Sequence, residues 1–232
     1  MKRSARTARL LIQVYEQLYA HHGPQGWWPG EGGPFETIVG AVLTQNTAWT
    51  NVERALANLR AEGLISPAAL RAVPEPALAE AIRPSGYFNT KARKLKAVAE
   101  HLARYGDDTD AWAAREAKEL RDELLGVYGI GPETADDIVL YVAGLPSFVI
   151  DSYTIRLMER LGVRAGRGRY ADWQEMFELN LPPDAPLFNE YHALLDAHAK
   201  DICRKREPRC GECVLASLCR AAPPASKEPL HE

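Results

Sequence analysis

Four cysteines near the carboxyl end of the chain are the residues whose types and spacing most clearly indicate chemistry. All four lie in one stretch, Cys203-x6-Cys210-x2-Cys213-x5-Cys219, and the rest of the chain contains none. Scattered pairs would suggest disulfides, whereas one tight cluster suggests a metal site in a reducing compartment. Four thiolates suit either zinc or an iron–sulfur cluster. The spacing differs from the paired CxxC motifs of zinc ribbons, which weakens the zinc interpretation.

Basic residues flank these cysteines. Arg204, Lys205 and Arg206 lie between the first two, and Arg209 precedes the second. A basic loop of this kind is suited to contacting phosphates. The net charge of the whole chain is −3, which does not suggest nucleic acid, so any basic surface must be local.

Asp151 is a candidate catalytic carboxylate. It follows three apolar residues, Phe148, Val149 and Ile150, and precedes a predicted helix. Most aspartates in this position only cap the helix. In a partly desolvated pocket, however, a carboxylate stabilises an oxocarbenium-like sugar and orients or deprotonates water at C1′. Position alone does not decide between the two roles.

A glycine-rich turn joins two predicted helices over residues 127–135, with the sequence VYGIGPETA. We expect Gly129 and Gly131 to form a tight turn that Cβ atoms would obstruct. Pro132 suits a first helical position, and the N–H groups at that helix start are suited to binding a DNA phosphate. The alternative is a plain interhelical turn.

Helical periodicity positions these residues, because alternating period-2 patterns are nearly absent. The glycine, proline, asparagine and serine clusters between the apolar patterns separate the elements. The pattern predicts helices at 7–20, 35–43, 49–61, 90–105, 117–125, 132–142, 152–161, 173–179 and 187–200. An all-α fold follows.

The amino-terminal segment is basic, and a transit or signal peptide is the alternative to a first structural helix. We favour the helix because Leu10, Leu11, Val14 and Leu18 fall on one face. No apolar run approaches the ~18 residues of a membrane span. We therefore expect no membrane partner.

Taken together, these motifs resemble the helix-hairpin-helix DNA glycosylases, and endonuclease III in particular, over about residues 30–220. The resemblance implies a [4Fe-4S] cluster on the four cysteines, Asp151 as the catalytic residue and damaged double-stranded DNA as the partner. It also implies a monomer in the cytoplasm, associated with a bacterial nucleoid. It also identifies Gln45 as the residue that fills the gap left by a flipped base. The DNA-contacting residues expected from these motifs are Gln45, Asn46, Gly129, Gly131, Thr134, Arg204, Lys205 and Arg206.

The family fold implies two helical domains. A six-helix barrel is expected at 34–145, with the helix-hairpin-helix at about 117–143. Residues 1–33 and 146–220 are expected to form the second domain, which carries the cluster, and 221–232, with three prolines, to form a disordered tail.

One departure from the family pattern concerns the mechanism. In bifunctional members, the residue before Thr134 is a lysine that attacks C1′ and forms a Schiff base. In this chain it is Glu133, which cannot form a Schiff base, so that lyase route should be lost. An acid in a first helical turn also has a simple structural role, because it interacts favourably with the helix dipole.

Several residues resemble the 3-methyladenine glycosylase branch of the superfamily. In that branch aromatic residues wall a purine pocket, and aromatic faces attract cationic alkylated purines by roughly 0.5–2 kcal/mol. The alternative for the tryptophans is core packing, and for Lys200 a solvated helix end. The pocket residues implied are Trp27, Trp28, Pro29, Trp49, Glu133 and Lys200.

The leading hypothesis is a monofunctional DNA glycosylase that excises alkylated purines by hydrolysis. One alternative is an endonuclease III-like glycosylase and AP lyase acting on oxidised pyrimidines, with another amine, such as Lys200, as nucleophile. The other alternative is a non-catalytic DNA-damage binder, which Glu133 motivates.

Overall fold

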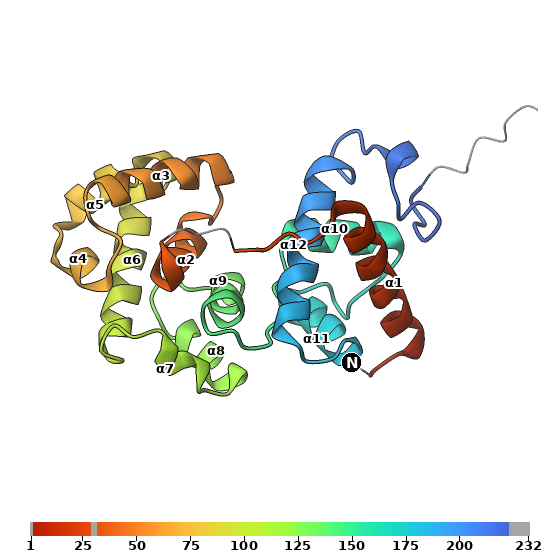
Figure 1. The fold of residues 1–232 in the computed structure, drawn as a ribbon, viewed down its shortest axis with the longest axis horizontal. Coiled ribbons are helices and arrows are strands. Elements are labelled where there is room, and N and C mark those ends of the chain that lie inside the picture. Colours follow the sequence, from red (N-terminus) through yellow and green to blue (C-terminus); the bar gives the residue numbers. More distant parts are fainter. Residues whose placement is uncertain (1, 29–31, 223–232) are drawn as a thin grey trace, which may run out of the picture. The chain divides into compact units, whose positions relative to one another are not determined.

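The computed structural model describes residues 2–28 and 32–222. The chain forms two compact units. Unit 1 consists of Met1–Gly26, Ile150–Pro182 and Glu190–Glu232, and unit 2 consists of Trp27–Val149 and Pro183–Asn189. The barrel expected at 34–145 falls within unit 2. All regular elements within the described part are helical (Figure 1), which confirms the all-α class.

Unit 1 is built on α1 (Ala5–His22), α10 (Ser152–Leu161), α11 (Tyr170–Asn180) and most of α12 (Ala185–Asp201). The oxygen of Ser4 caps α1, and Leu11, Val14 and Leu18 are buried on one face of this helix. The phenol of Tyr191 donates to the carbonyl of Leu11 at 2.8 Å. These contacts confirm a structural helix at the amino terminus.

Unit 2 contains the remaining α-helices (Figure 1). They are α2 (Gly33–Leu43), α3 (Trp49–Ala61), α4 (Pro67–Ala72), α5 (Glu75–Ala81), α6 (Phe88–Ala103), α7 (Asp110–Ala113), α8 (Ala117–Leu125) and α9 (Pro132–Asp137). Helix α2 is buried from Phe35 to Leu43 and is mostly apolar, with Glu36 as its one charged residue, so it is the central element of the core. None of the helices in the described ranges is long and apolar enough to span a bilayer.

The predicted helix at 132–142 is helical over its whole length, but its second half is not α-helical. Helix α9 ends at Asp137, and Ile138–Val142 (η2) form a π-helical turn. The N–H of Ala143 donates to the carbonyl of Ile138 at 3.1 Å, a bond that spans five residues and widens the helix.

Ion pairing fixes the geometry of the glycine-rich turn between α8 and α9. Arg121 on α8 donates to the fully buried carboxylate of Asp136 on α9 at 2.7 Å. The hydroxyl of Ser147 donates to the same carboxylate at 2.5 Å. A buried carboxylate needs such partners, so these contacts hold the two helices of the hairpin in register.

Candidate functional site

An aromatic cluster lies in unit 2, formed by Trp27, Trp28, Trp49 and Tyr141. The Trp28 ring centroid is 5.4 Å from that of Trp49 and 5.3 Å from that of Tyr141. The Trp27 and Tyr141 rings meet edge to face at 6.2 Å. All four side chains are partly exposed, so they do not belong to the fully buried core. Pro29, which was expected beside them, lies outside the described residues.

Two backbone features place this cluster. A Cβ on Gly40 of α2 would lie 3.1 Å from the indole of Trp28, so the glycine lets the ring lie close to the helix. Tyr141 lies on the π-helical turn η2, and such turns are frequent at functional sites. Tyr141 was not among the residues predicted from the sequence, because no local pattern distinguishes it from the apolar residues around it.

Gln45 lies between α2 and α3, and its side chain contacts the glycine-rich turn. Its amide donates to the carbonyl of Gly129 at 3.2 Å and to the hydroxyl of Thr134 at 2.9 Å. Lys94 on α6 donates to the Gln45 carbonyl oxygen. Three of the expected DNA-contacting residues therefore meet, with Lys94 as an additional cation. Asn46 is exposed, and its φ of +55° is in the left-handed region.

The two glycines of the turn differ in their requirements. Gly129 has a φ of +83°, and a Cβ there would lie 2.2 Å from Cγ of Lys94. Gly131 has a φ of −93°, and a Cβ there would meet no atom within 4 Å. The expectation that a Cβ atom would obstruct the turn is therefore confirmed at Gly129. It is wrong at Gly131, where an added Cβ would contact no other atom of this chain.

Glu133 occupies the first turn of α9 and is exposed. This position is the one in which a carboxylate interacts favourably with the amino end of a helix.

Asp151 is the N-cap of α10. Its Oδ1 accepts from the N–H of Thr154 at 2.7 Å, and its Oδ2 lies 3.9 Å from Nε2 of His192. Burial lowers the pKa of His192, although attraction to Asp151 and Asp196 opposes the shift. The shift favours the neutral form of the imidazole.

Helix α12 presents His192, Asp196 and Lys200 at intervals of four residues, which place them on one face. Lys200 pairs with Asp196 at 2.7 Å, and its ammonium is 5.6 Å from the centroid of the Tyr153 ring. Burial raises the pKa of Asp196, and the hydrogen bond from Lys200 opposes the shift. Neither His192 nor Asp196 was predicted from the sequence, although their spacing from Lys200 was a usable signal.

The four cysteines line one cavity of about 50 Å³ in unit 1. Arg160 on α10 donates to Sγ of Cys203 at 3.2 Å, and Nε2 of His198 lies 3.4 Å from Sγ of Cys213. Within the described ranges, no group of His, Cys, Asp or Glu side chains is arranged to hold a single metal ion. The donor set is four thiols around a space larger than one ion, which fits a multi-iron cluster.

Arg160 also holds the basic loop that follows α12. It donates to the carbonyls of Arg204 at 2.7 Å and Lys205 at 3.3 Å. The side chains of Lys205 and Arg206 are exposed. The backbone of the loop is thus fixed from within while these two cationic groups face solvent.

Comparison with known proteins identifies the family. A family model described as HhH-GPD superfamily base excision DNA repair protein matches residues 39–183. A putative DNA repair glycosylase of Methanocaldococcus jannaschii is 42% identical over 90% of this chain and 96% of its own length. An endonuclease III of Sulfolobus acidocaldarius is 32% identical over 80% of this chain and 81% of its own length.

Solved structures show the same fold. A non-covalent endonuclease III–DNA complex aligns with a TM-score of 0.78 at 22% identity, over 93% of this chain and 96% of that one. An H. pylori 3-methyladenine DNA glycosylase bound to 1,N6-ethenoadenine aligns with a TM-score of 0.70 at 25% identity, over 84% and 97%. With the family match and the sequence relatives, these results show that the chain belongs to the HhH-GPD superfamily of base excision DNA repair proteins.

Proposed function

We propose that this DNA repair glycosylase is monofunctional and hydrolyses the N-glycosidic bond of alkylated purines. The aromatic cluster carries the proposal, because it places four partly exposed rings in one unit. A solved structure similar to this chain is named as a 3-methyladenine DNA glycosylase and has an ethenoadenine bound, which supports a purine ligand.

The chemistry of alkylated purines matches such a cluster. A purine methylated at N3 or N7 is cationic, and aromatic faces attract a cation by roughly 0.5–2 kcal/mol. The same positive charge makes the base a good leaving group, so hydrolysis needs no covalent nucleophile. We assign Trp27, Trp28, Trp49 and Tyr141 to binding the flipped base.

Asp151 would stabilise the positive charge that develops on the sugar and orient the attacking water. Two observations support this role. The cap bond to Thr154 fixes the carboxylate, and the lowered pKa of His192 keeps the neighbouring imidazole uncharged. A neutral imidazole would not compete with the oxocarbenium-like sugar for the carboxylate.

The missing hairpin lysine supports hydrolysis without lyase chemistry, because Glu133 cannot form a Schiff base. Lys200 is the amine that could replace it, and it is held as an ion pair with Asp196. The ion pair must therefore be broken before the Lys200 nitrogen can attack C1′.

The second candidate function is that of an endonuclease III with lyase activity, favoured by relatives of that name. Borohydride trapping on DNA with a damaged base separates the two. The proposal predicts no covalent enzyme–DNA adduct. An adduct that is formed by the wild type and lost in Lys200→Ala would contradict it and identify Lys200 as the nucleophile.

We assign the DNA contacts to two regions. One is Gln45 together with the glycine-rich turn that it contacts, and the other is the exposed basic loop. Gln45 would fill the gap in the duplex, while the backbone at Gly129 and Gly131 and the side chain of Thr134 approach a phosphate. Lys205 and Arg206, with Arg204, would add sequence-independent contacts to phosphates.

We further propose that Cys203, Cys210, Cys213 and Cys219 hold a [4Fe-4S] cluster in a reducing compartment. When bound, such a cluster ties down the loop and is able to exchange an electron. Arg160 would hold the loop beside the cluster, because it donates to both the Cys203 sulfur and the loop carbonyls.

A further inference from the structure

A second concentration of positive charge lies in unit 1, around two adjoining cavities of about 610 and 490 Å³. The two cavities share Gly162, Val163, Arg164 and Arg220 in their linings. We call this continuous feature the arginine groove. Its volume is larger than a single phosphate group requires.

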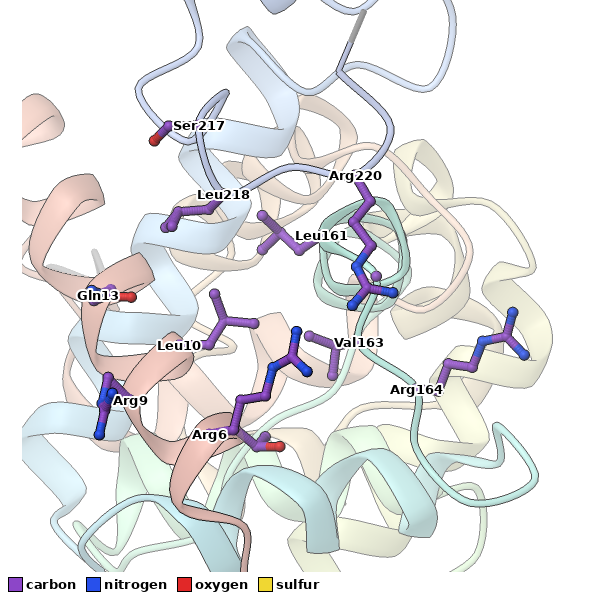
Figure 2. Close-up of a pocket in the computed structure, with 12 residues that line it drawn as sticks. Arg6, Arg9, Leu10, Gln13, Leu161, Val163, Arg164, Ser217, Leu218 and Arg220 are labelled. Atoms are coloured by element: carbon purple, nitrogen blue, oxygen red, sulfur yellow. The ribbon is translucent and has the colours of Figure 1, made fainter. Parts of the chain in front are cut away.

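Four arginines from three segments line the larger cavity. Arg6 and Arg9 come from α1, Arg164 follows α10, and Arg220 follows the last cysteine. Figure 2 shows Arg6 and Arg220 extending from opposite sides toward the same space beside Val163, with Arg9 and Arg164 farther out.

No acid balances these arginines in the larger cavity. Among its described lining residues there is neither Asp nor Glu, and the smaller cavity adds only Glu159. In the part of the chain that the structure describes, none of the four takes part in an ion pair. In a chain of net charge −3, this is a local positive field that attracts anions.

The geometry of Arg220 is fixed by its neighbours. The N–H of Ala221 donates to the carbonyl of Arg160 at 3.1 Å. The side chain then crosses Gly162, where a Cβ would lie 2.2 Å from Cδ of Arg220. The arginine is therefore held over the end of α10, and the cysteine segment positions it.

The floor of the groove is apolar. Leu161 and Val163 are almost fully buried beneath the arginines, and Leu10 and Leu218 complete the wall. Cationic groups above an apolar floor match a nucleic-acid strand, whose phosphates are charged and whose sugars and bases have apolar faces.

The arginine groove is distinct from the Asp151 site. Asp151 caps the first turn of α10, whereas Gly162 follows its last residue. A helix of this length separates its ends by ~15 Å. The groove therefore lies at the opposite end of α10 from the Asp151 carboxylate.

We propose that the arginine groove binds the sugar–phosphate backbone of a DNA strand, as a contact additional to the hairpin and the basic loop. Such a contact would hold the protein on DNA whether or not a damaged base is present. It depends only on charge and shape, so it carries no base specificity.

Fluorescein-labelled oligothymidylate is the probe for the first test, titrated with the full-length protein at several salt concentrations. Arg6→Ala with Arg164→Ala leaves the cysteine segment intact, and the triple variant adds Arg220→Ala. Arg104→Ala is the matched control, since Arg104 is exposed and lies outside the groove.

We expect the double variant to bind the oligonucleotide roughly 2- to 30-fold more weakly. The slope of log affinity against log salt should fall by about 1.4, from ~0.7 per lost contact to single-stranded DNA. The triple variant should bind the oligonucleotide still more weakly than the double variant. The affinity of the Arg104→Ala control should match that of the wild type. Affinity and slope that stay unchanged in both variants would overturn the proposal.

Hydrogen exchange locates the binding directly. Oligothymidylate should slow exchange in the peptides covering 161–168 and 217–221 of the wild type, and not in the triple variant. Absence of protection there, or protection by inorganic polyphosphate alone, would overturn the assignment to a DNA strand. Single-turnover excision is scored separately, so loss of the proposed catalytic function would not be mistaken for loss of the groove.

Discussion

Replacing Gly129 with alanine should destabilise the protein far more than the same change at Gly131. At Gly129, an alanine at a φ of +83° costs about 1–2 kcal/mol from backbone strain. Its Cβ would also lie 2.2 Å from Cγ of Lys94, so the lysine must move and release Gln45. Loss of that hydrogen bond adds about 1 kcal/mol, for a total of about 2–3 kcal/mol.

At Gly131 the backbone is extended and a Cβ meets no atom within 4 Å. A compatible Gly→Ala change stabilises a protein by about 0.4–1 kcal/mol, because it restricts the unfolded chain. The two variants, only two positions apart, should therefore change stability in opposite directions.

Urea unfolding followed by circular dichroism measures both free energies of unfolding. If Gly129→Ala and Gly131→Ala gave equal changes, the reasoning from φ and the Lys94 contact would be refuted. The affinity of the folded Gly131→Ala protein for duplex DNA is measured separately. Because the chain has room for the added methyl group, weaker binding would indicate that a DNA phosphate lies close to this backbone.

Three further predictions concern the site and its support. Asp151→Asn should abolish excision while duplex binding survives. The free energy of unfolding should change by less than about 0.5 kcal/mol, because asparagine caps a helix as well as aspartate. Retained excision would refute the assigned role. Trp28→Ala should lower kcat/KM on methylated DNA by about 2- to 30-fold, the equivalent of roughly 0.5–2 kcal/mol, and an unchanged value would exclude Trp28 from the pocket. Lys91 is buried and donates to the carbonyls of Leu43 and Ser85, and burial lowers its pKa from 10.5 to about 8. Between these two pH values the unfolded chain holds more protons, so wild-type stability should rise with pH relative to Lys91→Met; a difference between the two that is independent of pH would contradict this.

Long helices could be predicted from the sequence, because several turns of apolar residues repeat on one face. The bounds of 117–125 and 152–161 are those predicted. The short helices α4, α5 and α7 were missed, since fewer than eight residues each leave no room for a period. Ser66 and Pro67 were interpreted as a turn, yet Ser66 caps α4 and Pro67 begins it.

The same contrast applies to the site. The spacing of the cysteines and the apolar residues before Asp151 are local features, so the sequence alone was enough to select them. The contacts of Tyr141 and His192 join segments that are far apart in the chain. Tyr141, on the π-helical turn at 138–142, meets Trp28, and His192 on α12 lies near Asp151 at the start of α10.

Base release is the measurement that tests the central claim most directly. Wild-type protein is incubated with duplex DNA treated with a methylating agent and, in parallel, with DNA carrying an oxidised pyrimidine, each with and without alkali. The account predicts free methylated purine, with strand breaks only after alkali. Strand breaks on the oxidised substrate without alkali, and no release of methylated purine, would contradict it.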